Sequence, residues 1–303
     1  MNKLFADMLL SIRNVQEFTQ QGMVDRLVST HQAFEKLDLT TYSRWERGVT
    51  TPKLAKQVLL ARVFDVDVSG IIKENMNSLV YNAEVVDSYL NQMLTPYFTV
   101  IDQLRVRKYV GVPKDNALLD SLESFHSEYL GINFAPEVLN DPNLICEAYS
   151  DESGSLLGHF LYGFVERGCC NESLKVDTTE CPFVDKLANS TSLYVVSCFG
   201  SLPACRMTLL VSILNLLKNN PRCHSLLINN HDQTAFNLLN VPSMTPEIRN
   251  KGVVLANGGI KLGSKRYRFL QVEVEAQRIL SEKAFIELVV HSEQYLDVLR
   301  MDS

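Results

Sequence analysis

Apolar side chains recur at helical spacing through the first quarter of the chain. Two short helices joined near Thr19 are predicted within residues 8–28. Their apolar face comprises Leu9, Leu10, Ile12, Val15 and Phe18. A further helix is predicted after Pro52, in the segment LAKQVLLARV. Its inward positions are Leu54, Val58, Leu59, Ala61 and Val63.

The segment LDLTTYSRWERGVTTP, residues 37–52, separates polar from apolar positions most sharply. Asp38 is expected to cap a helix that Gly48 ends in the left-handed conformation. Leu39, Tyr42 and Trp45 recur at a spacing of three, which predicts a buried stripe. The other side carries the hydroxyl and guanidinium groups of Thr40, Thr41, Ser43, Arg44 and Arg47. Such groups reach base edges and phosphates in a major groove.

The run T-x-S-R-W-E-R-G-x-x-x-P, followed by an apolar helix and V-F-D-V-D-V, resembles the Cro/repressor-like (XRE) helix-turn-helix family over residues 9–73. The resemblance implies an all-α helix-turn-helix bundle that reads double-stranded DNA and ends in a strand-like tail at V-F-D-V-D-V. We expect base-edge contacts from Arg44 and Thr40. Phosphate contacts are expected from Thr41, Ser43, Arg47 and Gln20, which lies where the family opens its second helix. A solvated surface glutamine is the alternative for Gln20.

One departure from this family concerns the connection between its second and third helices. The family joins them by a tight turn, whereas residues 28–37 intervene here with several residues more than the pattern needs. Either the second helix runs on or the turn is a longer loop.

An apolar stripe at helical spacing runs through residues 77–94 and ends before Pro96. Its members are Leu79, Val80, Ala83, Val86, Leu90 and Leu94. A single amphipathic helix between domains must cover its stripe, so we expect a linker helix with dimer contacts. The chain is therefore divided into a DNA-binding domain (residues 1–75), a linker (76–96) and a second domain (97–303).

The second domain alternates strand and helix patterns. Strands are predicted in IDQLRVRKYV, LICEAYS, LLGHFLYGFV, TSLYVVSCF, RCHSLLINN and KRYRFLQVEVE. Helices are predicted in NALLDSLESFHSEYL, PACRMTLLVSILNLLKNN and HDQTAFNLLN, with one or two more in residues 276–300. LICEAYS and LLGHFLYGFV flank an acidic turn, which indicates an antiparallel hairpin. This order predicts an α/β or α+β mixed sheet.

The order of strand, helix, hairpin, central strand, long helix, strand, short helix and strand resembles the GNAT acetyltransferase fold. The resemblance implies a Q/R-x-x-G-x-G/A turn, in which backbone N–H groups and a helix N-terminus approach the phosphates of coenzyme A. The matching stretch, CFGSLPACRM, has Gly200 but no second glycine, and Pro203 removes a backbone donor. A structural role is favoured for both Glu147 and His159, so no catalytic residue is assigned. We predict a sensing or dimerising module, with acetyl-CoA as the cofactor that the resemblance allows.

A glycine-rich segment near residue 260 predicts a hairpin turn and not a phosphate loop, because no helix follows it. It contains Asn257, Gly258, Gly259 and Gly263. A basic cluster lies beside it, formed by Lys261, Lys265, Arg266 and Arg268. This cluster is either a solvated hairpin edge or a contact for DNA or another negative partner.

The net charge of −6 is unevenly distributed. Through Lys73 the chain has ten Lys and Arg against eight Asp and Glu, so the excess of acid lies beyond that residue. DNA binding would therefore rest on a local basic face. A single helix-turn-helix unit is expected to bind DNA with modest affinity. We therefore expect a homodimer that reads paired half-sites.

The seven cysteines all lie between Cys146 and Cys223, and an odd number favours reduced thiols in a cytoplasmic chain. Cys169, Cys170 and Cys181, with His159 and His224, match no zinc spacing, so no metal site is expected. No apolar run is long enough for a bilayer, and MNKLFADMLL is too short and acidic for a secretory signal. We expect a cytoplasmic protein with no membrane partner.

These observations leave three functional hypotheses. The first is a dimeric, sequence-specific transcription regulator whose second domain senses a small-molecule or acyl-CoA effector. The alternative is an acyl-CoA-dependent N-acetyltransferase fused to a DNA-binding domain. The third is an antitoxin-like or phage-type repressor that binds a protein partner.

Overall fold

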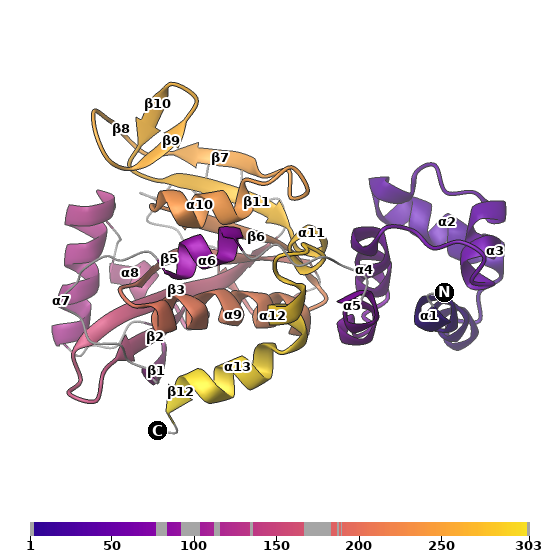
Figure 1. The fold of residues 1–303 in the computed structure, drawn as a ribbon, viewed down its shortest axis with the longest axis horizontal. Coiled ribbons are helices and arrows are strands. Elements are labelled where there is room, and N and C mark those ends of the chain that lie inside the picture. Colours follow the sequence, from indigo (N-terminus) through magenta and orange to yellow (C-terminus); the bar gives the residue numbers. More distant parts are fainter. Residues whose placement is uncertain are drawn as a thin grey trace.

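An all-helical N-terminal unit lies beside a larger unit that is built on a mixed sheet (Figure 1). The computed structural model describes residues 3–76, 84–91, 104–111, 116–133, 136–166, 183–186, 188 and 190–301. Cys169, Cys170 and Cys181 and most of the expected linker helix lie outside these ranges. No helix in the described ranges combines the length and apolarity that crossing a membrane requires.

The N-terminal unit follows the capping signals of its sequence. Its elements are α1 (Lys3–Val15), α2 (Gln20–Thr30), the 3₁₀ turn η1 (Gln32–Phe34), α3 (Leu39–Glu46), α4 (Leu54–Val63) and α5 (Ser69–Met76). Thr19 caps α2 by accepting a hydrogen bond from the Gly22 amide (3.0 Å), and Asp38 caps α3 by accepting one from the Thr41 amide (2.7 Å). Gly48 follows α3 at φ +68°, which glycine adopts without steric cost. The predicted ends of α3 are therefore confirmed.

Several expectations for this unit are wrong. Leu39 is 42% exposed, because it occupies the first position of α3 and only the later turns pack inward. Leu10 and Val15 are also exposed, since α1 begins at Lys3 and buries Phe5, Ala6, Leu9 and Ile12. V-F-D-V-D-V is not strand-like, because Val63 ends α4 and residues 64–68 connect α4 to α5. The longer α2–α3 connection contains η1, so the second helix does not run on.

The larger unit has a mixed sheet with strand order β12-β1-β2-β3-β5-β6-β11-β7, and β4 pairs with β3. The bounds are β1 (Leu104–Val110), β2 (Ile145–Ser150), β3 (Leu156–Glu166), β4 (Phe183–Val184), β5 (Thr191–Gly200), β6 (Cys223–Asn230), β7 (Glu247–Lys251), β11 (Leu270–Glu275) and β12 (Arg300–Met301). β5 and β6 run parallel, whereas β2 and β3 form the predicted antiparallel hairpin. The large mixed sheet and its order of elements are consistent with a GNAT-like α/β fold.

Helices cover both faces of this sheet. The bounds are α6 (Glu84–Leu90), α7 (Asn116–Ser124), the π-helix η2 (Phe125–Leu130), α8 (Pro136–Leu139), α9 (Pro203–Asn219), α10 (Gln233–Leu239), α11 (Ala276–Leu280), α12 (Ile286–Val290) and α13 (Ser292–Leu299). On one face, Leu122 of α7 belongs to a buried cluster with Leu161 and Val196. On the other, α9 packs on Phe160 and Val195. Neighbouring strand residues thus point to opposite faces, as the pleat requires.

The carboxyl-terminal part departs from prediction in three places. KRYRFLQVEVE forms two strands, β10 (Lys265–Tyr267) and β11, which belong to different sheets. β10 lies between β8 (Val254–Leu255) and β9 (Ile260–Leu262) in a small sheet, with the expected glycine turns beside it. β7 was not predicted, and residues 276–300 hold three helices instead of one or two.

Buried polar contacts join the two units. Arg62 of α4 is 4% exposed and donates to the carbonyl oxygens of Leu217 (2.7 Å), Asn220 (3.1 Å) and Cys223. These carbonyls lie where α9 ends and β6 begins. His31 Nε2 also lies 3.6 Å from Glu275 Oε1. These contacts between the two units therefore fix the orientation of α3 relative to the larger unit.

Candidate functional site

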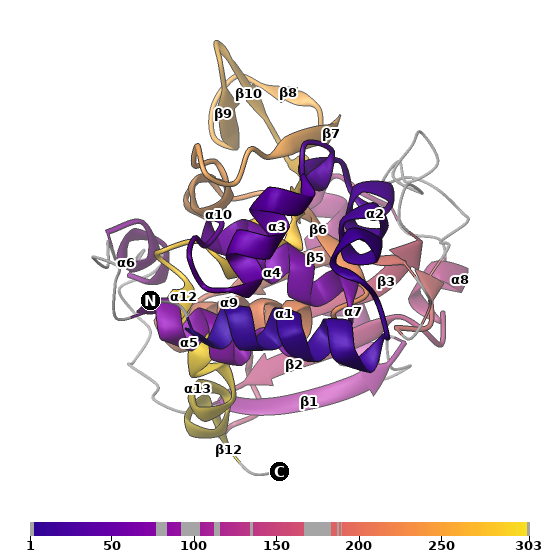
Figure 2. The same cartoon turned by 90° about the vertical axis from the view of Figure 1, so that its right-hand side faces the viewer.

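The outer surface of α3 presents the predicted DNA-contacting side chains. In Figure 2 the N-terminal unit faces the viewer, and α3 lies on its outward side. Thr40, Arg44 and Arg47 are exposed, and Thr41 and Ser43 are half-buried. The first four of these residues in sequence order lie on α3, and Arg47 follows directly as its C-cap residue.

The opposite side of α3 is anchored in the core. Tyr42 is 0% exposed and Trp45 is 6% exposed. The Trp45 ring meets Phe5 of α1 in an edge-to-face contact with centroids 6.4 Å apart. Two aromatic anchors one turn apart hold the helix, so its polar side faces outward.

Gln20, the sixth predicted contact, lies at the first position of α2. Its Nε2 donates to Glu46 Oε2 at 2.9 Å, so one of its two amide N–H groups is already engaged. A contact with a phosphate would use the second N–H group. Gln20 is therefore not the freely solvated glutamine of the alternative interpretation.

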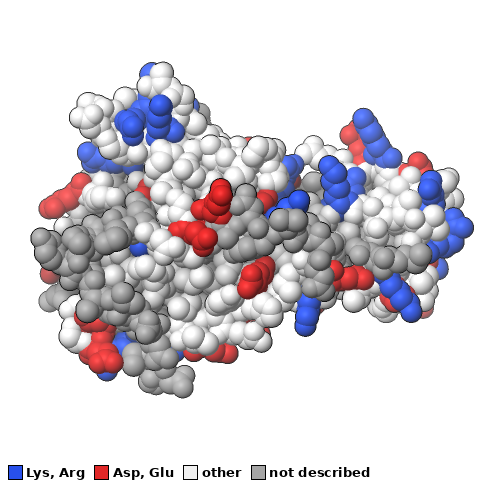
Figure 3. Space-filling model, in the orientation of Figure 1, with Lys and Arg blue, Asp and Glu red and all other residues white. Residues whose placement is uncertain are grey.

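Basic side chains are present on two parts of the surface. Figure 3 shows Lys and Arg atoms on the outer part of the N-terminal unit and on the small sheet β8-β10-β9. On the latter, Lys261, Lys265 and Arg266 are exposed, whereas Arg268 is half-buried. Arg266 Nη1 donates to the Gly258 carbonyl at 3.3 Å, which holds this side chain against its own turn.

A second candidate site lies where β5 and β6 separate. Their backbone pairing ends at Val195 and Ile228, although β5 continues to Gly200 and β6 to Asn230. The Asn229 side chain bridges the start of the gap by donating to the Val196 carbonyl (2.9 Å) and to Tyr194 Oη (3.0 Å). Beyond this bridge, at the carboxyl ends of two parallel strands, lies a cavity of about 60 Å³. Such ends commonly form ligand sites in sheets of this type.

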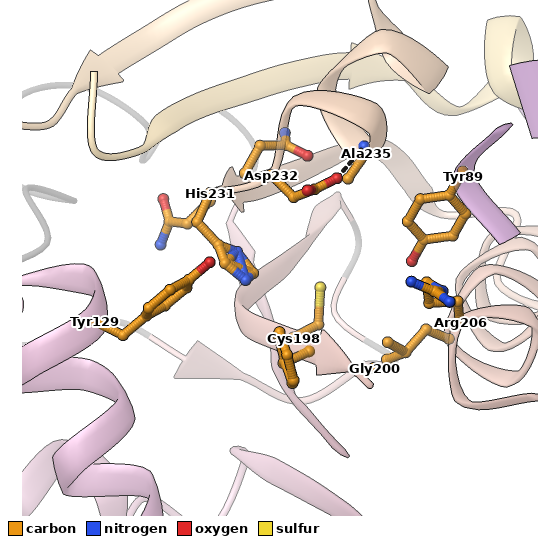
Figure 4. A pocket seen from close by; sticks show the side chains of 12 residues that line it. Tyr89, Tyr129, Cys198, Gly200, Arg206, His231, Asp232 and Ala235 are labelled. Atoms are coloured by element: carbon orange, nitrogen blue, oxygen red, sulfur yellow. Dashed lines mark hydrogen bonds between the residues drawn. The ribbon is translucent and has the colours of Figure 1, made fainter. Parts of the chain in front are cut away.

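Polar groups from three elements line this cavity (Figure 4). Arg206, in the first turn of α9, is 3% exposed, and its Nε and Nη1 atoms have no hydrogen-bond partner. Asn230 Nδ2 and His231 Nε2 are also buried without partners. Burial lowers the pKa of His231 to about 4, so its imidazole is neutral at pH 7. Burial likewise lowers the pKa of Arg206 from its usual value.

The first turn of α9 lies close to β5 because residue 200 is a glycine. A Cβ at Gly200 would lie 3.0 Å from the Arg206 amide nitrogen and 3.0 Å from Cys205 Cβ. The predicted CFGSLPACRM segment therefore brings a helix N-terminus and the Arg206 side chain to the end of a strand. The absent second glycine does not prevent this approach.

Tyr89 of α6 covers the cavity from the side opposite the sheet. In Figure 4 its hydroxyl group points toward the Arg206 guanidinium. α6 packs against both α9 and α10, and its Val86 and Leu90 are buried. Burial raises the pKa of Tyr89 above its ordinary range, so its phenol is neutral. The described part of the expected linker helix thus forms one wall of the cavity.

A histidine cluster on the other face of the sheet was missed from sequence. His126 Nε2 and His159 Nε2 lie 2.7 Å and 3.0 Å from Ser197 Oγ, respectively. Burial lowers the pKa of His126 to about 4 and that of His159 well below its usual value. All three residues are buried, so the cluster is a structural network of neutral groups. This arrangement agrees with the structural role expected for His159.

Glu147 has a structural role as well. It is 4% exposed and accepts a hydrogen bond from Arg300 Nη2 at 3.1 Å. Arg300 belongs to β12, which pairs with β1. The ion pair with Glu147 therefore helps to hold β12 at the edge of the sheet. Glu147 is thus a buried partner of Arg300.

The thiols that the structure describes are unreactive at neutral pH. Burial raises the pKa of Cys146 and Cys198 to about 12 and that of Cys205 and Cys223 to about 11. A protonated thiol is a poor nucleophile and a poor metal ligand. Within the described ranges, no group of three or more His, Cys, Asp or Glu side chains could hold a metal ion.

Three residues of the cavity were not predicted from the sequence: Arg206, Tyr89 and His231. One local signal was present, because Arg206 is the single charged residue in the apolar run PACRMTLLVSIL. A charge on an otherwise apolar helix must either reach solvent or meet a buried partner. The other two residues join the cavity only through the tertiary fold.

No protein-family model and no curated protein matches the chain. Among solved structures, it is similar to Arabidopsis thaliana NAA60 in complex with acetyl-CoA, with 15% identity and a TM-score of 0.33 over 56% of this chain and 97% of that one. It is also similar to TofI in an apo form, with 9% identity and a TM-score of 0.34 over 62% of this chain and 99% of that one. At these sequence identities and TM-scores, the similarity says nothing about the activity or the ligands of this chain.

Proposed function

We propose that the chain is a sequence-specific, DNA-binding transcription regulator in which α3 enters the major groove. The observation that carries the proposal is the division of α3 into a polar side, on which Thr40 and Arg44 are exposed, and an aromatic side that is buried in the core. An outward helix with this composition has the donors that base edges and phosphates accept. The helix-turn-helix resemblance of residues 9–73 supports the same function.

Each polar side chain of α3 has a proposed partner. Thr40 and Arg44 contact base edges, and an arginine at such a position favours the O6 and N7 atoms of guanine. Thr41, Ser43 and Arg47 contact phosphates, together with Gln20 at the start of α2. The contact with Glu46 holds the Gln20 side chain close to the end of α3.

The proposed regulator is a homodimer with a three-part chain. Residues 1–75 bind DNA, residues 76–96 link the domains and contribute dimer contacts, and residues 97–303 sense a ligand. Two copies would place two α3 helices on half-sites about one helical turn apart, or a multiple of it. Exposed Lys261 and Lys265 lie far from α3 in sequence and have no assigned role in this scheme.

Selection of duplexes from a random pool by the full-length chain tests this function. Enrichment of one shared motif supports sequence-specific binding, and a palindromic motif supports the dimer. Recovery of unenriched sequence after repeated rounds would remove the proposal.

An acyl-CoA-dependent N-acetyltransferase is the second candidate. It is favoured by the GNAT-like sheet and by the cavity at the separated ends of β5 and β6. Calorimetric titration with acetyl-CoA separates the two functions. Acetylation of an amine would establish the enzyme, whereas binding without turnover would favour a regulator that senses the thioester. Absence of binding at millimolar acetyl-CoA would exclude both of these roles for the thioester.

A further inference from the structure

Arg206 is a buried cation whose N–H donors are not all satisfied. It is 3% exposed, and neither Nε nor Nη1 has a hydrogen-bond partner. Asp232 lines the same cavity, but its carboxylate already accepts from the Ala235 amide (2.8 Å) and from Thr234 Oγ1 at the start of α10. Asp232 places a negative charge near Arg206, but buried N–H donors that lack an acceptor are costly to leave without a hydrogen bond. The cavity is therefore built to receive an anionic group beside Arg206.

The surrounding groups favour a single negative charge. Asn230 Nδ2 and His231 Nε2 are further buried atoms that lack partners and can donate hydrogen bonds, but neither residue adds a positive charge at pH 7. Asp232 opposes a second negative charge in the same space. A guanidinium binds a planar carboxylate through two parallel N–H···O bonds. These features fit a monocarboxylate better than a phosphate dianion.

An apolar chamber of about 50 Å³ adjoins the polar cavity. The two share Tyr89, Cys198, Leu209, Asn230 and Ala235. The rest of the chamber is lined by apolar side chains of α9, α10, α11, β6 and the start of α12. Since about 10–15 Å³ of such volume admits one water molecule, the two spaces together hold roughly ten non-hydrogen atoms. The chamber suits a short hydrocarbon chain.

We propose that this double cavity binds a short-chain monocarboxylate, with its carboxylate on Arg206 and Asn230 and its hydrocarbon tail between α9 and α10. The ligand would also contact Tyr89 of α6, which belongs to the segment between the two units. Binding here does not require that α3 reads DNA. If the proposed function holds, this ligand is the effector of the regulator.

Calorimetric titration of the full-length chain with sodium butyrate tests the site. Butyrate is expected to bind more tightly than acetate, because its longer tail fills the apolar chamber. Inorganic phosphate and butyryl-CoA serve as the comparison ligands. The proposal would be overturned if either comparison ligand bound and butyrate did not. It would also be overturned if butyrate did not bind at millimolar concentration.

The Arg206→Met variant tests the polar end, with Arg107→Met on exposed β1 as its matched control. Loss of the charged hydrogen bonds is expected to weaken butyrate binding about 10- to 100-fold. Without ligand, the same variant should unfold at a higher temperature than the wild type, because it no longer buries N–H donors that lack acceptors. Unchanged butyrate affinity in Arg206→Met would contradict the assignment.

The Ala235→Leu variant tests the apolar end without altering Arg206. Ala235 lines both spaces, so the added carbons occupy the chamber. Butyrate should lose its advantage over acetate in this variant. Asn237→Leu adds the same side chain at an exposed position of α10 and should keep that advantage. An unchanged butyrate preference in Ala235→Leu would show that the tail lies elsewhere.

Discussion

Arg13 of α1 and Glu46 at the end of α3 form an ion pair in which Nη2 lies 2.7 Å and Nε 2.8 Å from Oε1. Glu46 is 4% exposed, and its second carboxylate oxygen accepts from Gln20 of α2. One buried carboxylate thus joins the first three helices. The contact sets the angle at which α3 and Gln20 face the surface, which is the geometry that the proposed DNA contact requires.

Glu46→Ala should destabilise the N-terminal unit by about 1–3 kcal/mol, since it removes the acceptor from two donors beneath α3. Trp45 is the only tryptophan of the chain, so its fluorescence during urea unfolding reports on this unit alone. Glu35→Ala, at an exposed position, should leave the curve unchanged. Equal unfolding midpoints for Glu46→Ala and Glu35→Ala would show that the ion pair contributes nothing.

Arg47→Gln should weaken binding to every duplex by a similar factor, because a phosphate contact carries no sequence information. The slope of log affinity against log salt concentration should become shallower by about 1. Fluorescence anisotropy titrations at several salt concentrations measure both effects. If the slope stays the same while one base pair of the motif loses its preference, Arg47 contacts a base and not a phosphate.

Arg62→Met should uncouple the two units, because it removes three hydrogen bonds that cross the contact. The expected loss of stability is about 2–4 kcal/mol. The Trp45 transition should then occur at lower urea than the transition in far-ultraviolet circular dichroism. Arg26→Met, on the exposed side of α2, is the matched control. Coincident transitions in Arg62→Met would indicate that apolar packing alone joins the units.

Stability should fall between pH 6.5 and pH 4 because His126 and His231 are buried as neutral groups. Burial lowers the pKa of each to about 4, from 6.5 in the unfolded chain. In this window the unfolded state binds more protons than the folded state, so stability is fully present above pH 6.5 and is lost as the pH falls through 4. Between pH 7.5 and 5, each histidine should cost about 2 kcal/mol.

His126→Gln tests this dependence. The variant should lose less stability than the wild type when urea unfolding is compared at pH 7.5 and pH 5. His291→Gln, between α12 and α13, replaces a histidine outside the cluster and should behave as the wild type does. An identical pH dependence in all three proteins would contradict the assignment of His126 as a buried neutral group.

Local chemistry made many elements predictable. Asp38, Thr19 and Gly48 mark helix ends through their own hydrogen bonds and backbone angles, and Pro203 marks the start of α9. The alternation of LICEAYS and LLGHFLYGFV specifies a hairpin whose register depends on few residues. Such signals lie within a few residues of the feature that they determine, so they can be read from sequence.

The cavity could not be predicted because its parts meet only through distant pairing. Arg206 and Asn230 are brought together by the separation of β5 from β6, and Tyr89 arrives from the other side on α6. Likewise, Ser197 lies 71 residues from His126 and 38 from His159. The break between β10 and β11 also depends on which sheet each strand joins. No periodicity in the chain encodes these relationships.

The most direct test of the DNA-reading account compares Arg44→Ala with the wild type on the selected motif and on its single-base variants. Lys73→Ala, which removes a positive charge from an exposed position of α5, is the control. We expect Arg44→Ala to lose about 1–3 kcal/mol of affinity for the motif and to discriminate less at one base pair, and Lys73→Ala to do neither. Equal affinity and equal base preference in Arg44→Ala and the wild type would contradict the DNA-reading account.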